Sequence, residues 1–132
     1  MEVIMTLKID NDYIINTLGK NLVEDARAET TDAERHVRLY LDNLYTRTLV
    51  KVMEDDVTVT SEDALLARLD TEEKVELFKT AQAWQAVYEM SNGINALILD
   101  EHSDVGKDWN RVTTRILRNA LGFNRTTLFT AR

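Results

Sequence analysis

Acidic residues are the first feature of this 132-residue sequence that could do chemistry. The run Glu72-Glu73-Lys74-Val75-Glu76 has the form EExxE, and Glu101-His102-Ser103-Asp104 has the form ExxD. Carboxylate oxygens are the ligands that Mg²⁺ prefers, and a bound Mg²⁺ could hold substrate phosphates. However, Asp100, Ser103 and Gly106 predict a turn for the second segment, and acids in a first helical turn are favoured by the helix dipole. We therefore interpret these carboxylates as caps and solvated charge, and we predict no metal, no cofactor and no catalytic residue.

The same two segments are similar to the motifs of all-α nucleoside triphosphate pyrophosphohydrolases of the MazG type. In that family the carboxylates face each other across two helices and hold Mg²⁺. The resemblance implies a metal-dependent nucleotide hydrolase as one alternative function, although that family needs ExxD inside a helix. The two histidines, His36 and His102, have no partner at HExxH-like spacing, and no serine has the context of a nucleophile elbow. We predict that the chain is not an enzyme.

Cations gather at the end of an otherwise acidic chain. The net charge is -7, yet from Lys107 onward six Lys and Arg stand against one acid, a balance of +5. The preceding residues hold the other 10 cations and 22 acids, a balance of -12. Helical spacing puts four of these cations within about 80° on one face, which predicts an electrostatic docking surface. The predicted partner-binding residues are Lys107, Arg111, Arg115, Arg118, Phe123, Arg125, Leu128, Phe129 and Arg132.

The predicted basic stripe lies opposite an apolar face that contains Val105, Trp109 and Ile116, so no aromatic residue is interleaved with the arginines. This pattern argues against sequence-specific nucleic-acid recognition. The acidic body leaves a second alternative, a small inhibitor that presents carboxylates to a nucleic-acid-processing protein.

Helical periodicity predicts an all-α fold, a bundle of four or five helices with a long central helix and a short extended C-terminal tail. There is no proline or cysteine, and 44% of the residues are hydrophobic. We expect one helical domain over residues 1–122 and a basic tail over residues 123–132. No apolar run approaches the roughly 20 residues that cross a bilayer, so no membrane partner is expected. The predicted helices cover about 12–27, 31–53, 61–69, 71–99 and 104–121, with an extended segment at 57–60 and a bend at Gly93.

Each long helix has a predicted apolar stripe. The three stripes are Val37, Leu41, Leu44, Thr48 and Val52, widened by Tyr40 and Tyr45; Leu77, Ala81, Trp84 and Tyr88, with Phe78 beside them; and Val105, Trp109, Val112, Ile116 and Ala120. Because Trp84, Tyr88 and Trp109 are in register with these stripes, we predict that they belong to the core.

The stretch from Val75 to Phe123 resembles the second half of small head–tail connector (adaptor, head-completion) proteins of tailed phages. The resemblance rests on the helix FKTAQAWQAVYEM, an irregular acidic turn, the final helix NRVTTRILRNALGF and a short basic, extended tail. It implies a homo-oligomeric ring of roughly twelve copies in the virion neck, made in the host cytoplasm. It also implies that the C-terminal segment docks on the portal protein and that other neck and tail proteins are partners.

Overall fold

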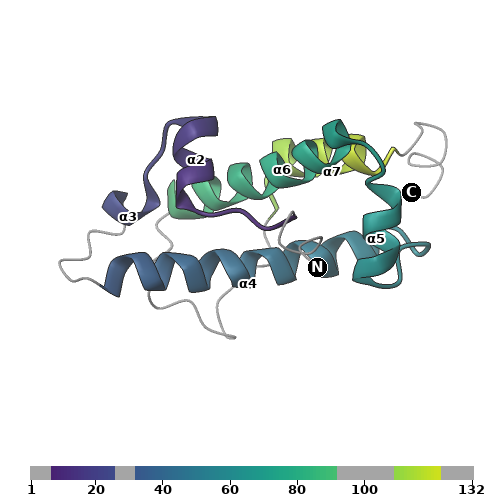
Figure 1. Cartoon of the computed structure of the whole chain (residues 1–132), viewed down its shortest axis with the longest axis horizontal. Helices are drawn as coiled ribbons and strands as arrows, with labels where there is room; N and C mark the ends of the chain where they lie inside the picture. The colour runs from purple at the N-terminus through teal and green to yellow at the C-terminus, as the bar shows by residue number, and fades with distance from the viewer. Residues whose placement is uncertain (1–6, 26–31, 92–108, 123–132) are drawn as a thin grey trace.

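The computed structural model describes residues 7–25, 32–91 and 109–122, and this part of the chain is all-α, without a strand (Figure 1). The all-α prediction is therefore confirmed. Helix α4 forms one side of the molecule, helices α2, α6 and α7 form the other, and α5 connects α4 to α6 at one end. The helices are α2 (Asn11–Leu18), α3 (Leu22–Asp25), α4 (Asp32–Asp55), α5 (Glu62–Arg68), α6 (Glu72–Ser91) and α7 (Arg111–Leu121).

The single helix predicted over residues 12–27 is two helices, which raises the number of described helices to six. Gly19 ends α2 in the left-handed conformation, with φ 70°, and its N–H donates to the carbonyl of Ile15. Glycine adopts this conformation without the steric penalty of a Cβ atom, so Gly19 ends the helix. Asn11 then connects the two helices, because its side-chain oxygen accepts from the N–H of Leu22 at 2.8 Å.

Helix α4 agrees with its prediction in both extent and phase. All five residues of the predicted stripe are buried, as are the two tyrosines beside it: Val37, Tyr40, Leu41, Leu44, Tyr45, Thr48 and Val52. A stripe this regular directs one face of the helix into the core whatever packs against it.

The segment at 57–60, predicted to be extended, is a turn. The carboxylate of Asp56 accepts from the N–H and the hydroxyl of Thr58, at 2.9 and 2.6 Å. This local hydrogen bonding competes with an extended backbone and leaves Val57 83% exposed while Val59 is buried. The prediction of the next helix is confirmed: Ser61 caps α5 by accepting from the N–H of Ala64.

Helix α6 begins where it was predicted, but the rotation about its axis differs. Phe78 and Ala81 are buried, whereas Trp84 is 38% exposed, so the prediction of Trp84 as a core residue is wrong. Tyr88 is half-buried. The buried face instead contains three polar residues, Gln82, Gln85 and Glu89. The predicted continuation of this helix to residue 99, with a bend at Gly93, lies outside the described residues.

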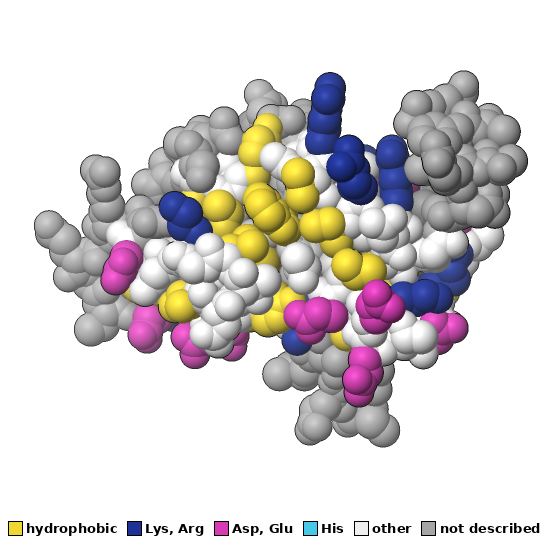
Figure 2. Space-filling model, turned by 90° about the horizontal axis from the view of Figure 1, so that it is seen from above, with side chains coloured by type: hydrophobic (Ala, Val, Ile, Leu, Met, Phe, Trp, Pro, Cys, Tyr) yellow, Lys and Arg dark blue, Asp and Glu magenta, His cyan; other side chains and the backbone are white. Residues whose placement is uncertain are grey.

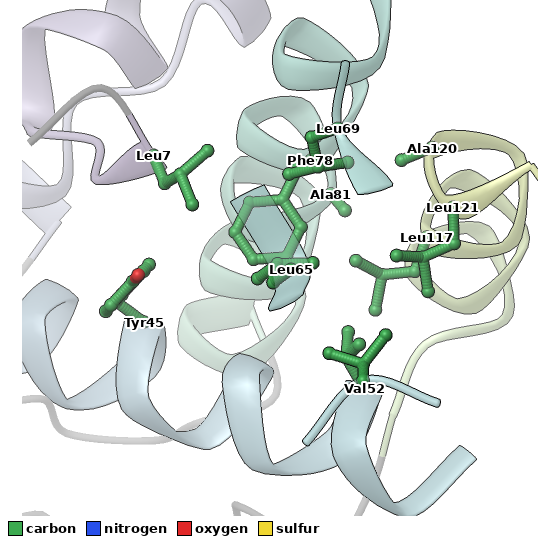
Figure 3. Packing of buried hydrophobic residues seen from close by; sticks show 11 residues of the cluster. Leu7, Tyr45, Val52, Leu65, Leu69, Phe78, Ala81, Leu117, Ala120 and Leu121 are labelled. Atoms are coloured by element: carbon green, nitrogen blue, oxygen red, sulfur yellow. The ribbon is translucent and has the colours of Figure 1, made fainter. Parts of the chain in front are cut away.

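Two apolar clusters hold the bundle together. The cluster at the α5 end is centred on Phe78, with Tyr45 edge-on to its ring at a centroid distance of 6.4 Å, and with Val52 and Leu117 pointing toward one another (Figure 3). The second cluster lies at the other end, between α2, α3, α4 and α6. Helix α7 is seated mainly in the first cluster, through the buried residues Leu117, Ala120 and Leu121.

Candidate binding surface on helix α7

The start of α7 is set by Asn110. Its backbone is extended, with φ -63° and ψ 142°, and its side-chain oxygen accepts from the N–H of Val112 at 2.7 Å. This is an N-cap, so the helix begins at Arg111. The prediction that the last helix begins at about residue 104 is therefore wrong. The predicted end is confirmed, because Gly122 closes the helix in the left-handed conformation.

The buried face of α7 is rotated by about one residue from the predicted one. The prediction placed Val112, Ile116 and Ala120 on the buried face, but Val112 is 39% exposed and Ile116 is only partly buried. The buried residues are Thr113, Leu117, Ala120 and Leu121. Apolar residues occur on the predicted face and on the observed face of α7. The position of α6 decides which of these two faces is buried.

Three of the predicted partner-binding residues are described, and they share one surface. Arg111 and Arg115 are exposed and Arg118 is partly exposed. Together with Trp109 and Thr114 they line a shallow groove of about 280 Å³. The other six predicted residues, Lys107, Phe123, Arg125, Leu128, Phe129 and Arg132, lie outside the described residues.

Trp109 lines this groove, although the prediction placed it on the opposite face from the arginines. It precedes the N-cap, so the 100° rotation per residue of a helix does not apply to it. The prediction that Trp109 belongs to the core is correct in part, because Trp109 is partly buried and packs against the second apolar cluster. The groove therefore does combine an aromatic ring with guanidinium groups, contrary to the prediction.

The arginines of α7 differ from most other cations of the domain in their pairing. Elsewhere, acids lie within 4 Å of the cationic nitrogens of Lys8, Arg47, Lys51, Arg68 and Lys74. Within residues 7–25, 32–91 and 109–122, no acid pairs with Arg111, Arg115 or Arg118. Among the described residues, no ion pair therefore neutralises these three charges.

A buried ionic network holds the first turn of α7 in place. The Glu89 carboxylate, fully buried in α6, accepts from Arg47 Nη1 at 2.8 Å and from Nη2 at 3.0 Å. It also accepts from the hydroxyl of Tyr40 and from Gln85 Nε2, the latter at 3.0 Å. Because the amide nitrogen of Gln85 is turned toward Glu89, its oxygen is turned toward Asn110 and accepts from that N–H at 3.1 Å.

The pKa shifts in this network keep Tyr40 neutral and Arg47 charged. Burial raises the pKa of Tyr40 well above its ordinary value, and the Glu89 carboxylate raises it further, so Tyr40 stays a neutral donor. Burial by itself lowers the pKa of Arg47, but the hydrogen bonds and charge of Glu89 outweigh burial and raise it. Arg47 therefore remains a cation although it is largely buried.

The other end of α7 is held by Arg68. Its Nη2 donates to the carbonyl of Leu121 at 2.9 Å, while its Nη1 pairs with the Asp56 carboxylate at 2.8 Å. A guanidinium at the C-terminus of a helix complements the helix dipole and satisfies an otherwise unpaired carbonyl. With both ends anchored, the three arginines project from a fixed helix.

Sequence reasoning missed this network because it treats polar residues as surface residues. A signal is present in α6, where Gln82, Gln85 and Glu89 follow Phe78 at intervals of four, three and four residues. That spacing puts all of them in phase with the buried phenylalanine. Alanines 81, 83 and 86 beside them permit the close packing that buries such residues.

The carboxylates of the EExxE run lie on the surface of the molecule. Glu72, Glu73 and Glu76 are exposed on the first turns of α6, and Glu76 accepts from the hydroxyl of Tyr13. The described residues contain no group of three His, Cys, Asp or Glu that could hold a metal ion. Glu101, His102 and Asp104 lie outside the described residues, and His36 is partly buried. No helix of the described part is both long enough and apolar enough to cross a membrane.

The chain matches no protein-family model, no curated protein and no solved structure. The exposed arginines of α7 and the contacts that anchor this helix are therefore the features that carry the functional interpretation.

Proposed function

We propose that this chain is a structural binding module that assembles head to tail with copies of itself, forming a ring that joins a phage portal to the tail. The single observation that carries the proposal is the row formed by Arg111, Arg115 and Arg118. This row is exposed on an anchored helix and has no acidic partner in the described part of the chain. Surface charge of this kind contributes at most about 1 kcal/mol per pair to folding, so folding alone gives no reason for it.

The distribution of charge suits a ring. In a closed ring of identical subunits every interface is heterologous, so one surface of a copy meets a different surface of the next. A basic surface and an acidic one on the same molecule are a complementary pair of this kind. In Figure 2, one group of cationic side chains stands at the upper edge of the molecule, most acidic side chains lie toward the lower edge with a few further cations among them, and hydrophobic ones lie between the two edges. The ring would contact the portal and other neck proteins in the virion.

The proposed assembly is tested by sedimentation and negative-stain electron microscopy of the purified chain. The wild type should form a ring whose stability falls with added salt, because 1 M salt shortens the screening length to about 3 Å. The triple variant Arg111→Glu, Arg115→Glu, Arg118→Glu should remain monomeric and folded.

A matched control changes the net charge equally at exposed cations elsewhere: Lys20→Glu, Arg35→Glu and Arg38→Glu. This control should assemble, which separates loss of the α7 surface from general repulsion. A wild-type chain that stays monomeric at all concentrations and salt levels would overturn the ring. A monomer that instead binds a basic nuclease would favour the acidic inhibitor.

A further inference from the structure

Acidic charge is concentrated where α4, α5 and α6 meet. Residues 54–76 contain nine acids and two cations, a balance of -7. Both cations are partly buried and paired within the same segment, Arg68 with Asp56 and Lys74 with Asp70. No cation of this segment is exposed, so its surface carries negative charge only.

Four acids of this segment have no partner of their own. Of the other five, three belong to ion pairs with Lys51, Arg68 and Lys74, and two accept from tyrosine hydroxyls. The remaining four are exposed, and among the described residues no cation pairs with them: Glu54, Asp63, Glu72 and Glu73. Figure 1 shows α5 and the start of α6 at one end of the bundle, and we call the exposed surface of residues 54–73 the acidic end.

The other end of the bundle is of mixed charge. Its exposed acids, on α2, α3 and α4, are accompanied by as many exposed cations: Asp12, Glu24 and Glu34 against Lys20, Arg35 and Arg38. Since like charges repel across an interface, such a surface offers arginines little net attraction. Charge complementarity with the α7 row therefore selects the acidic end.

The acidic end also carries the most exposed large hydrophobic side chain of the described residues, Val57, at 83%. One exposed valine is ordinary by itself, but this one projects from a turn that is held firmly. The N–H of Val59 donates to the Asp56 carbonyl at 3.0 Å, and the Asp56 carboxylate accepts from Thr58 and from Arg68. A fixed turn loses little conformational entropy when it binds, which favours its use in a contact.

The groove on α7 has the matching properties. Its volume is about 280 Å³, and it combines the aromatic ring of Trp109 with the guanidinium groups of Arg111, Arg115 and Arg118. Guanidinium groups suit carboxylates because they can donate two parallel hydrogen bonds. Trp and Arg are also among the residues most enriched where interfaces concentrate their binding energy.

We propose that the α7 groove of one copy receives the acidic end of the next copy, with Val57 against Trp109 and the unpaired acids beside the arginines. This inference rests on the proposed head-to-tail assembly and names the two surfaces that meet. Val57 follows α4, whereas α7 lies on the other side of the bundle (Figure 1). One copy can therefore use both surfaces at once, each toward a different neighbour, as a heterologous contact requires.

The experiment reverses the charge of each surface separately and then of both together. The row variant is Arg111→Glu with Arg115→Glu, and the end variant is Glu54→Lys with Asp63→Lys. All four residues are exposed and helical, so circular dichroism should show folded proteins. Sedimentation at low salt should show each variant associating about tenfold or more weakly than the wild type, because close charge pairs across an interface are worth at least about one power of ten in affinity.

The decisive protein carries all four substitutions in one chain. It should regain most of the wild-type association, because the reversed row again faces a surface of opposite charge. Its matched control combines the row variant with Glu24→Lys and Glu34→Lys, which gives the same net charge but alters acids of the other end. This control should associate as weakly as the row variant.

The role of Val57 is tested by Val57→Ser, which should weaken association about tenfold. Leu39→Ser is its control, since Leu39 is 52% exposed on α4 outside the acidic end, and it should assemble normally. An unchanged affinity of Val57→Ser would overturn the placement of Val57 against Trp109.

Two further outcomes separate this contact from the assembly on which it rests. A four-substitution chain as weak as the row variant would overturn the pairing of surfaces, while the arginine-dependent assembly of the wild type would stand. A wild type that stops at a dimer but shows the same charge rescue would support the contact and refute the ring. A wild type that stays monomeric would refute both.

Discussion

Guanidinium groups occur in two contrasting settings in this protein. Arg47 lies between α4 and α6, where its side chain is 19% exposed and makes a bidentate pair with a carboxylate that is fully buried. The arginines at positions 111, 115 and 118 project from α7 along an open groove, without an acidic partner in the described part of the chain. The same chemical group is thus internal structure in one place and available surface in the other.

Burial decides whether a charge acts in folding or in binding. Removing one member of a buried pair leaves the other desolvated and uncompensated, which destabilises a protein by about 3–5 kcal/mol. Removing an exposed charge is worth about 1 kcal/mol or less. Substitutions in the interior network should therefore lower the free energy of unfolding, whereas substitutions of the exposed arginines of α7 should weaken binding.

The largest expected effect follows from Arg47→Leu. This change leaves the Glu89 carboxylate buried without its cation, and we expect the free energy of unfolding to fall by about 3–5 kcal/mol. Urea denaturation at neutral pH measures it. The double variant Arg47→Leu, Glu89→Leu should regain most of the loss, because apolar side chains replace the whole pair. A single variant within about 1 kcal/mol of the wild type would mean that the interior pair behaves like a surface pair.

Trp109→Ala should have the next largest effect on stability, because Trp109 contacts both the interior and the arginine groove. It packs against the second apolar cluster and also lines the arginine groove. A fully buried tryptophan is worth about 3–5 kcal/mol, so a partly buried one predicts a loss of about 2 kcal/mol. Thermal unfolding should show a lower melting temperature, and Trp109→Phe should restore most of it. An unchanged melting temperature would assign Trp109 to binding alone.

Acid should weaken the anchor at the far end of α7. Burial alone would raise the pKa of Asp56, but the hydrogen bonds from Thr58 and the charge of Arg68 outweigh it and lower the pKa below its ordinary value. A lowered folded-state pKa contributes stability above the unfolded value of about 3.9, and this contribution is lost as the pH falls through the folded-state pKa. The free energy of unfolding should therefore decline below about pH 4. Asp56→Asn should be less stable at neutral pH and show a shallower decline, and an equally steep one would refute this assignment.

The smallest expected effect on stability comes from neutralising the exposed row. The variant Arg111→Gln, Arg115→Gln, Arg118→Gln should unfold within about 1 kcal/mol of the wild type in total, because these side chains are solvated. Urea denaturation provides the comparison with Arg47→Leu, and sedimentation should show loss of assembly in the same samples. A loss of stability above about 2 kcal/mol would show that the row is structural after all.

Sequence periodicity predicted α4 well because most of its apolar residues repeat on one face, with Leu39 and Val50 as the exposed exceptions. The caps at Ser61 and Gly122 were also predictable, since each acts on backbone groups within a few residues of itself. Helix α7 shows where this approach fails. Val112 and Leu117 are both apolar but lie on different faces of the helix, so the periodicity is compatible with two buried faces. The predicted stripe was the one that contains Val112 and leaves out Leu117.

The sequence by itself determines the all-α character and the boundaries of α4 and α5, because these depend on interactions within a few turns. It also determines the concentration of arginines near the C-terminus. The tertiary structure alone decides that Glu89 is buried against Arg47 and Tyr40, since these two residues lie on another helix and are more than 40 positions away in the sequence. The tertiary structure likewise decides the rotation of α7 about its axis. Packing against α6 and the hydrogen bond from Asn110 to Gln85 determine which of the two apolar faces of α7 is buried. Local interactions specify which helices form, and long-range packing specifies which of their faces remain available to a partner.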